Sequence, residues 1–542
     1  MIRRVVLIYP AARRYTGLLS THRLPGLVMA HTGLPILAEI RDGLGSETVV
    51  HDEQVTPFSE AMVTGADLVG ISIQTAWSRQ GYRIARAVRR LGKPVVMGGA
   101  HATLNPDEAM EAADYVVRGE GEKTLPELIE VIDGRREPES VLGLSYRENG
   151  RVFHNPPRPL LTTEELDRVP WPRLDRIEGF TDRRRFPWNR RVYATMLTRG
   201  CDQACTYCSI TRVFGRGLRH RSPANVIEEL GSRFDPRRQF LFFMDDSLAV
   251  DRDFLKEVLD SIRRLKLVPR LGWHSQMRAD VADDPELLRL MKETNCLFVT
   301  CGFESVSDAS LRSLGKGQSA ADVARAIERL SRHRVLVNGF FMFGTDHDGP
   351  ECFDATVRFA RSAGCLMGGF MPVTPFPGTP MFRSLDAQGR IFTRDCELYD
   401  VQHVVYRPAR MSALDLYWRT LACYPAFYGK DHLLRLGRFA RGRGLAPSVL
   451  ATLAGWFAVK DLCWSREVLA NLDYMAALRR FERAGPGATF PDLGERRLWA
   501  KDLLSGRTLR RLAWHPRLGF PPAERLASRA GVSTAAAPAC RS

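Results

Sequence analysis

The sequence predicts an α/β protein with two successive units of alternating strands and helices, followed by a helical C-terminal region. Short runs rich in Val and Ile, separated by helix-like stretches, recur from residue 3 to about 134 and again from residue 191 to about 408. Such runs are typical of strands buried on both faces of a parallel sheet. We therefore expect a doubly wound, flavodoxin/Rossmann-like N-terminal domain and then a (βα)6 partial TIM barrel.

The first unit, placed at residues 1–140, has the element order of a flavodoxin-like domain. Its candidate strands are Arg3–Tyr9, Thr48–His51, Leu68–Ile73, Pro94–Met97 and Tyr115–Val117. Its helix-like stretches are Pro25–Gly43, Ser59–Thr64, Ser78–Leu91 and Glu122–Ile132.

Residues 141–190 have a different composition. Leu142–Tyr146 and Arg151–His154 flank Glu148–Asn149–Gly150, a turn sequence that predicts a β-hairpin. Five prolines between residues 156 and 172 then indicate an extended linker.

The second unit, placed at residues 191–408, has six strand–helix alternations, which predicts an open partial barrel with its chemistry at the carboxyl ends of the strands. Its candidate strands are Tyr193–Thr198, Phe240–Met244, Leu271–His274, Leu297–Gly302, Val335–Phe343 and Met367–Val373. Its candidate helices are Pro223–Phe234, Asp253–Leu265, Pro285–Asn295, Ala320–Arg332 and Pro350–Ser362. We expect a helical region at residues 409–490 and a basic, partly disordered tail at residues 491–542.

The net charge of +16 comes largely from arginines, many of them in the C-terminal third. A basic surface attracts nucleic acid, anionic lipid or acidic substrates. No nucleic-acid-binding motif accompanies the charge, so we expect no nucleic-acid partner and interpret the excess as a solvated, Arg-rich surface.

The number and spacing of the cysteines indicate the cellular compartment of the protein. Eleven cysteines at irregular spacing favour a reducing cytosol over a disulfide framework. The apolar run Val5–Tyr9 is too short for a signal peptide, and no segment has the 18 or more apolar residues of a membrane span. We expect a cytoplasmic protein.

Cys201, Cys205 and Cys208 form a CxxxCxxC sequence directly after the first strand of the predicted barrel. Thiolates hold iron–sulfur clusters, and three close cysteines can bind three irons of a [4Fe–4S] cubane and leave the fourth iron open to a ligand. The alternatives are a zinc site, which would need a fourth protein ligand, or three unrelated thiols.

The cysteine loop and the strands around it resemble the radical SAM superfamily over about residues 193–408. The resemblance implies that the three cysteines are metal ligands and catalytic, and that the cluster cleaves S-adenosylmethionine to a 5′-deoxyadenosyl radical. It also implies that further residues contact the cluster or S-adenosylmethionine at the strand ends. These are Tyr207, Asp245, Asp246, Glu304, Ser305, Gly339 and Gly344. Pro375–Thr379 follows the sixth strand, as in a loop common in one subfamily.

Two glycine-containing loops end strands of the first unit, at Gly98–Thr103 and Gly119–Glu122. Glycines there let a ligand approach the backbone closely, although tight βα turns need them too. Together with the cysteine loop, they resemble the cobalamin-binding radical SAM enzymes over nearly the whole chain up to about residue 490. The resemblance implies cobalamin contacts at Gly98, Gly99, His101, Gly119, Glu120 and Gly121.

One feature departs from many cobalamin domains. The loop Pro10–Gly17 lacks the histidine of the DxHxxG sequence that ligates cobalt, and most members of this subfamily lack it too. The resemblance implies that Gln74, Thr75 and Trp77 cover the lower face of the cofactor. For His101 it implies a contact to the nucleotide tail or a structural bond rather than a bond to cobalt.

This pair of cofactors implies methylation of an unactivated carbon through methylcobalamin, with an electron donor such as flavodoxin or ferredoxin. The alternative is a non-methylating oxidation or ring closure, as in the anaerobic tetrapyrrole cyclases that the chain also resembles. A cobalamin-binding regulator without turnover is a third reading, and the intact cysteine triad disfavours it.

The substrate is less well defined. A small molecule, lipid, tetrapyrrole or secondary metabolite fits, and Asp400, His403 and Tyr406–Pro408 either face the active site or pack. The apolar run Pro447–Val459 follows a basic stretch at Arg435–Arg443, which permits peripheral membrane contact or a buried helix beside a basic surface.

Overall fold

The computed structural model describes residues 2–11, 31–43, 45, 47–182, 184, 191–429, 431–443, 471–485 and 487–493. Several predicted features lie wholly or partly outside these residues. They are the loop Pro10–Gly17 from residue 12, the start of the helix predicted at Pro25–Gly43, the apolar run Pro447–Val459 and the basic tail from residue 494.

The N-terminal domain is a doubly wound sheet, as predicted. Its strands lie in the order β2 (Glu47–Asp52), β1 (Arg4–Tyr9), β3 (Leu68–Ser72), β4 (Val95–Gly98), β5 (Tyr115–Val117), β6 (Leu144–Glu148) and β7 (Arg151–His154). Strands β1 to β5 pair in parallel in the flavodoxin-like order 2-1-3-4-5. The predicted hairpin forms β6 and β7. Strand β6 pairs antiparallel with β5, and β7 pairs with β6, so the hairpin extends this sheet to seven strands instead of belonging to the linker.

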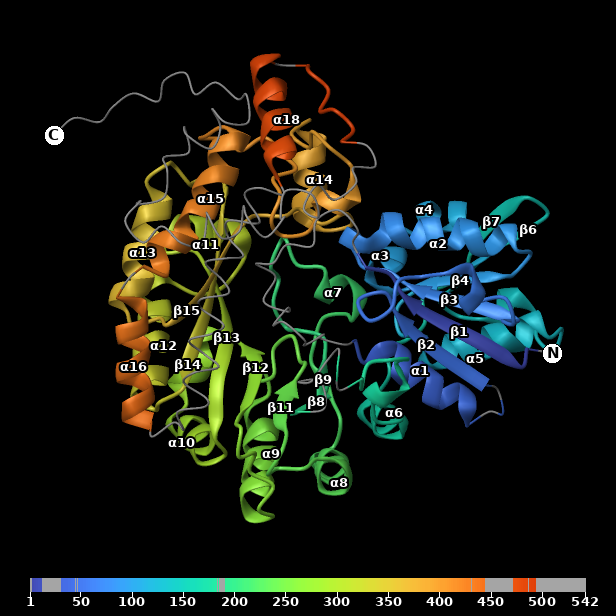
Figure 1. Ribbon diagram of the computed structural model, residues 1–542, viewed down its shortest axis with the longest axis horizontal. Helices are drawn as coiled ribbons and strands as arrows, with labels where there is room; N and C mark the ends of the chain where they lie inside the picture. The colour runs from blue at the N-terminus through green and yellow to red at the C-terminus, as the bar shows by residue number, and fades with distance from the viewer. Residues whose placement is uncertain are drawn as a thin grey trace.

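Both faces of this sheet are buried, because alternate residues of β1 serve two separate clusters. Val5 and Leu7 pack with α1 (Gly33–Asp42) and α5 (Gly121–Ile132). Val6 and Ile8 pack on the opposite face with α2 (Ser78–Arg90) and α4 (Pro106–Ala112). In Figure 1 these two pairs of helices lie on opposite sides of the blue sheet.

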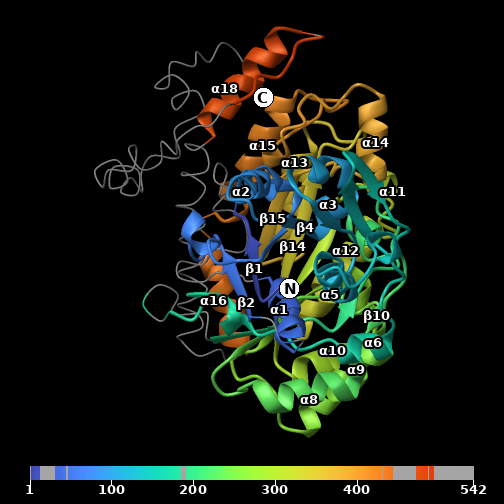
Figure 2. The same ribbon diagram turned by 90° about the vertical axis from the view of Figure 1, so that its right-hand side faces the viewer.

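The second unit is an open barrel of six parallel strands, which confirms the predicted (βα)6 arrangement. The strand order is β8 (Val192–Thr195), β11 (Phe240–Phe243), β12 (Trp273–Met277), β13 (Cys296–Glu304), β14 (Leu336–Phe343) and β15 (Met367–Pro372). Its outer helices are α8 (Pro223–Arg233), α9 (Arg252–Arg264), α10 (Pro285–Glu293), α12 (Ala320–Arg332) and α13 (Cys352–Ser362). Figure 2 shows the N-terminal domain in front of this barrel.

C-terminal helices cover the β15 edge of the barrel. The Tyr424 hydroxyl of α15 (Ala413–Phe427) bonds both N–H and C=O of Phe370, at 3.1 and 3.0 Å. The Tyr428 hydroxyl bonds Gly368 in the same way, at 2.9 and 2.8 Å. These hydroxyls satisfy backbone groups that an exposed edge strand would leave open to pairing with another chain.

The residues around 400–408 pack against neighbouring segments and connect the barrel to the C-terminal helices. The buried His403 ring lies 3.0 Å from Asp400 through Nδ1 and 2.8 Å from Asn471 through Nε2. The buried Tyr406 hydroxyl donates to the Gly344 carbonyl at 2.5 Å. Of the two readings of this segment, the contacts favour packing.

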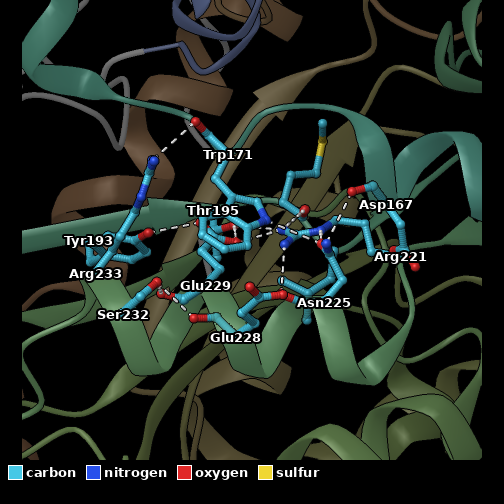
Figure 3. A network of polar contacts seen from close by, with 12 residues as sticks. Asp167, Trp171, Tyr193, Thr195, Arg221, Asn225, Glu228, Glu229, Ser232 and Arg233 are labelled. Carbon is cyan, nitrogen blue, oxygen red and sulfur yellow. Dashed lines mark hydrogen bonds and ion pairs between the residues drawn. The ribbon is translucent and has the colours of Figure 1, made fainter.

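The proline-rich linker is fixed to the first barrel helix by the polar network of Figure 3. Asn225 of α8 accepts from Trp171 Nε1 at 3.3 Å and donates to the Asp167 carbonyl at 3.1 Å. The buried Arg221 guanidinium bonds both Asn225 and Glu229, and Glu229 also accepts from two side chains of β8. The linker is therefore anchored to α8 at Asp167 and Trp171.

Candidate active site

The cysteine loop follows the short strand β9 (Thr198–Arg199), which lies outside the barrel sheet, and it begins with a glycine that no other residue can replace without strain. Gly200 has φ +88°, and a Cβ there would lie 2.4 Å from the Gly217 carbonyl oxygen. L-residues rarely adopt this backbone conformation. The turn therefore depends on glycine, and it sets the position of Cys201, the next residue.

All three predicted cluster ligands are half-buried thiols outside any disulfide. Burial raises the pKa of Cys201 and raises the pKa of Cys208 to about 12. A buried thiolate without a partner is costly, and coordination to iron supplies the positive charge that offsets this cost. The environment therefore suits metal ligands better than free nucleophiles.

The loop is held from two sides at Thr206. Its backbone N–H donates to the Leu314 carbonyl at 3.0 Å, and its carbonyl accepts from Met381 at 3.0 Å. Leu314 ends α11 (Asp308–Leu314), and Met381 lies in α14 (Pro380–Ala387), which follows the Pro375–Thr379 loop. The cysteines are thus fixed relative to the fourth and sixth barrel strands.

The spacing of the thiols distinguishes a cluster from a single ion. Within the described residues, the triad does not form a group whose ligand atoms all lie within 4.8 Å of one another. A tetrahedral zinc ion needs its ligands gathered around one point, whereas each thiolate of a cubane binds a different iron. The donor set therefore fits a [4Fe–4S] cluster.

Tyr207 and Glu304, both predicted cofactor contacts, meet beside the cysteines. The Tyr207 hydroxyl donates to Glu304 Oε1 at 2.9 Å, and Lys316 Nζ donates to the same oxygen at 2.8 Å. Glu304 has φ +64° and follows a register shift between β13 and β14. The bulge turns this carboxylate toward the cysteine loop. Sequence reasoning missed Lys316.

The two aspartates after β11 have different surroundings. Asp245 is fully buried and accepts from Leu197 N, Thr198 N and Thr198 Oγ1 at 2.5–3.3 Å. Burial raises its pKa to about 7 despite these bonds. Its contacts fix the strand end that leads into the cysteine loop. Asp246 is solvent-accessible, yet surrounding protein raises its pKa to about 6, and its charge helps raise the pKa of Cys208.

The remaining barrel residues of the predicted site make close protein contacts. A Cβ on Gly339 would lie 2.8 Å from the Phe303 ring, and one on Gly344 would lie 2.4 Å from the Tyr406 hydroxyl. Ser305 accepts from the backbone N–H of Ser307 at 3.1 Å. These glycines serve close packing, and their approach to S-adenosylmethionine remains a prediction.

In the N-terminal domain, a threonine joins the two glycine-containing loops. Thr103 donates to the Gly99 carbonyl at 2.9 Å and accepts from the Gly119 N–H at 3.0 Å. Gly98 ends β4 and Gly121 begins α5, so both loops lie at the carboxyl edge of the parallel sheet. Ligands of such sheets bind at this edge. The position fits cobalamin, and Thr103 holds the two loops together there.

The predicted lower-face residues lie at the end of the neighbouring strand β3. Gln74 precedes the turn Thr75–Trp77, and the Trp77 ring packs edge-on against His31 with centroids 5.1 Å apart. His101 is fully buried, and its Nδ1 lies 3.3 Å from Thr75 Oγ1. The contact involves Nδ1 alone, so the expectation that His101 is not a cobalt ligand stays a prediction.

Glu120 links the two halves of the site. Its buried carboxylate accepts from Arg199 at 2.9 Å, from Arg219 at 2.9 and 3.0 Å, and from the Leu161 N–H at 2.8 Å. Glu122 accepts from the other nitrogen of Arg199 at 2.6 Å. Arg199 is two residues before Cys201, so the Gly119–Glu122 loop is clasped to the base of the cysteine loop. We call these four side chains, Glu120, Glu122, Arg199 and Arg219, the interdomain clasp.

Comparison with known proteins agrees with both parts of the site, the cysteine loop of the barrel and the glycine-containing loops of the N-terminal domain. The model of the radical SAM superfamily matches residues 195–360, and the model of the B12-binding domain matches residues 26–129. The bacteriochlorophyllide d C-12(1)-methyltransferase of Chlorobaculum tepidum is 27% identical over 356 residues, which cover 64% of this chain and 72% of that protein. An anaerobic magnesium-protoporphyrin IX monomethyl ester cyclase of Cereibacter sphaeroides is 25% identical over 415 residues, 74% of this chain and 62% of that one.

Solved structures share the fold. The cobalamin-dependent S-adenosylmethionine radical enzyme OxsB with aqua-cobalamin bound has a TM-score of 0.62 at 15% identity, over 98% of this chain and 82% of that chain. The radical S-adenosylmethionine methyltransferase TsrM of Kitasatospora setae, with cobalamin and a [4Fe–4S] cluster bound, has a TM-score of 0.58 at 20% identity, over 72% and 75% of the two chains. With the cysteine triad and the glycine-containing loops in place, this chain carries a B12-binding domain and a radical SAM domain, the two domains that the cobalamin-binding radical SAM enzymes combine.

Proposed function

We propose that this enzyme transfers a methyl group to an unactivated carbon of a small-molecule substrate, using S-adenosylmethionine, a [4Fe–4S] cluster and cobalamin. The observation that carries the proposal is the interdomain clasp. It fixes the loop that holds the cluster ligands to the loop predicted to hold cobalamin. A methyl transfer that uses both cofactors needs them held in a constant relative position.

When bound, the cofactors supply the radical and methyl-transfer chemistry, while the protein positions them and excludes water. Cys201, Cys205 and Cys208 hold the cluster. We propose that Glu304, oriented by Tyr207 and Lys316, contacts S-adenosylmethionine together with Ser305 and Asp246. We propose that cobalamin approaches the backbone at Gly98, Gly99, Gly119 and Gly121.

Ring closure is the second candidate, because anaerobic cyclases are among the relatives, and that of Cereibacter sphaeroides matches over 74% of this chain. The same cofactor sites serve either reaction. We propose that the substrate is a tetrapyrrole, a lipid or a secondary metabolite, and that its chemistry decides between the two outcomes.

Deuterium labelling separates these candidates. The reconstituted enzyme is incubated anaerobically with S-adenosylmethionine carrying a deuterated methyl group, together with a host extract. Deuterated methyl in a product supports methyl transfer, whereas 5′-deoxyadenosine formed without label in any product favours cyclisation. The Cys205→Ala variant is expected to lose S-adenosylmethionine cleavage and keep cobalamin binding. Loss of both in this variant would contradict separate cofactor sites.

We further propose a cytoplasmic location and a flavodoxin or ferredoxin as the electron donor. A net charge of +16 favours association with an acidic protein, and screening by salt weakens such association. The rate of cluster reduction by flavodoxin should fall as ionic strength rises. A rate that is independent of salt would argue against an electrostatic docking surface.

Peripheral membrane contact rests on α16 (His432–Arg443). Leu433 and Leu434 are 57% and 65% exposed, next to several arginines. Exposed apolar residues with flanking basic ones favour binding to anionic lipid. No helix in the described part of the chain combines the length and apolarity that crossing a bilayer requires. Co-sedimentation with anionic liposomes tests the contact, and absence of binding at low salt would exclude it.

A further inference from the structure

A second group of metal-ligating side chains lies away from the cysteine triad, where the C-terminal part of the barrel unit packs on the N-terminal domain. His101 comes from α3 (Gly99–Leu104), Glu108 from α4, and Cys396 from the short helix η7 (Cys396–Leu398). One ligand atom from each of the three lies within 4.8 Å of the other two. Within the described residues, no other three such side chains gather in this way.

His101 points its ring nitrogen into this group. Nε2 is buried and has no hydrogen-bond partner, and the nearest carboxylate oxygen, Glu108 Oε2, lies 3.5 Å away. That distance is long for an N–H···O hydrogen bond. It matches the separation of roughly 3.3–3.8 Å between neighbouring ligand atoms around a tetrahedral zinc ion.

The other ring nitrogen, Nδ1, has a hydrogen-bond partner, as the non-coordinating nitrogen of a metal-ligating histidine usually does. His101 Nδ1 lies 3.3 Å from Thr75 Oγ1, and it can donate its proton there, which leaves the Nε2 lone pair free. Asn105 Nδ2 lies 3.3 Å from the same Nδ1, so a tautomer with the proton on Nε2, donated to Glu108, is the competing arrangement. In the first arrangement the Nε2 lone pair can bind a metal ion. In the second it cannot, because Nε2 carries the proton.

We propose that His101, Glu108 and Cys396 bind a divalent zinc ion that straps the helix η7 to the N-terminal domain. Imidazole nitrogen, carboxylate oxygen and thiolate sulfur are the three donor types that zinc accepts. The fourth position belongs to water or to the buried Tyr82 hydroxyl, which lies beside Glu108. Binding releases the Cys396 thiol proton to solvent and involves no change of oxidation state.

The surroundings show what the ion would hold together. Helix η7 packs on α2 and on the turn Thr75–Trp77 that we place under cobalamin. Next to the group, Arg79 of α2 donates to Asp395 at 3.2 Å, so a partly buried ion pair already links the same two segments. A zinc ion would add a covalent-strength link there and make the position of the Thr75–Trp77 turn depend on metal.

Metal analysis of the full chain tests this proposal. The reconstituted holoenzyme is incubated with zinc alone, freed of excess metal and analysed for zinc, iron and cobalt. The full chain with all three triad cysteines changed to alanine is treated in parallel, because an empty triad can itself take up zinc. We expect about one zinc per chain in both proteins, with an X-ray absorption signal for one sulfur at about 2.3 Å.

Variants locate the ion. Cys396→Ser and Glu108→Gln should each weaken zinc binding by at least about tenfold, whereas Cys352→Ser, at a half-buried cysteine outside the group, should not. Glu108 is 44% exposed, so its variant keeps the test valid even if Cys396→Ser fails to fold. Zinc should also slow hydrogen exchange at η7. Absence of zinc from the wild-type chain, or equal zinc in wild type and Glu108→Gln, would overturn the proposal in favour of the histidine–carboxylate hydrogen bond.

Discussion

Arg199 Nη1 donates to Glu120 Oε1 at 2.9 Å, and both side chains are more than nine-tenths buried. Arg199 ends β9, directly before the cysteine loop, whereas Glu120 lies between β5 and α5, in the loop that we assign to cobalamin. A buried pair of this kind contributes little net stability compared with apolar residues, but breaking it by removing one partner leaves an unpaired buried charge. The interdomain clasp therefore makes the two loops dependent on each other's position.

Glu120→Gln should uncouple the two halves of the reaction. The substitution removes the charge opposite Arg199 and Arg219 while keeping the size of the side chain, at a cost of about 3–5 kcal/mol. We expect methyl transfer to fall more than the formation of 5′-deoxyadenosine, so that the ratio of methylated product to 5′-deoxyadenosine drops. The ratio is measured by mass spectrometry of anaerobic assays.

Glu165→Gln is the matched control for that variant. Glu165 pairs with Lys123, and both side chains are at least 30% exposed, so loss of this pair should change the free energy of unfolding little. The product ratio should stay at the wild-type value. An unchanged ratio in Glu120→Gln as well would show that the clasp does not position the cofactors.

The clasp also predicts how stability depends on pH. Burial acts to raise the pKa of Glu120, but Arg199, the Leu161 N–H and Arg219 outweigh it and hold the pKa below its usual 4.5. A carboxylate with a lowered pKa contributes stability above its unfolded value and loses it as pH falls through the folded value. Wild type should therefore exceed Glu120→Gln in free energy of unfolding most above pH 4.5, with the difference shrinking in more acidic buffer. Urea unfolding of the cluster-free full chain measures this difference, and a difference independent of pH would contradict the assignment.

Most strands could be predicted from the sequence, because burial on both faces imposes continuous apolar runs that are visible locally. Strand β5 has the predicted bounds, and β4 is displaced by one residue. Helices α3 and α4 were missed, because Gly98–Gly99 and Asn105–Pro106 are typical of loops. Tertiary packing overrides that local preference, since Ala102, Ala109 and Met110 are buried against the sheet.

The cysteine triad could be predicted because its spacing is a local property of one loop. The residues that contact this loop or its neighbours from distant parts of the chain could not be predicted. Glu120 and Arg199 are 79 residues apart, and no periodicity links them. The direction of Glu304 depends on a bulge in β13, which a pattern of apolar residues does not reveal. One signal was available for this contact. The Gly119–Glu122 loop is acidic and Arg199 precedes the first cysteine, so the two functional loops carry complementary charges.

Lys316→Met should reveal what Glu304 does. The change leaves the buried Glu304 carboxylate without its cation, which costs about 3–5 kcal/mol, so we expect loss of both stability and S-adenosylmethionine cleavage. Adding Glu304→Gln removes the unpaired charge and should restore most of the stability. If Glu304 contacts S-adenosylmethionine, cleavage stays low in this double variant. Recovery of cleavage together with stability would instead assign Glu304 a purely structural role. Thermal unfolding and 5′-deoxyadenosine formation are measured on the same preparations.

Gly200→Ala tests whether the turn before Cys201 controls the assembly of the cluster. A Cβ at this position would lie 2.4 Å from the Gly217 carbonyl oxygen, an overlap with backbone that the loop can relieve only by shifting. Because Cys201 is the next residue, we expect a drop of roughly tenfold or more in cluster affinity, equivalent to about 1.4 kcal/mol or more.

Gly217→Ala is the control, since Gly217 has a similar φ of +94° but a Cβ added there would meet no described atom within 4 Å. Both variants carry the strain of a left-handed alanine, about 1–2 kcal/mol, so only the steric overlap separates them. Iron and sulfide content after anaerobic reconstitution gives the answer, and equal iron in the two variants would show that backbone strain alone, and not the contact with Gly217, limits the loop.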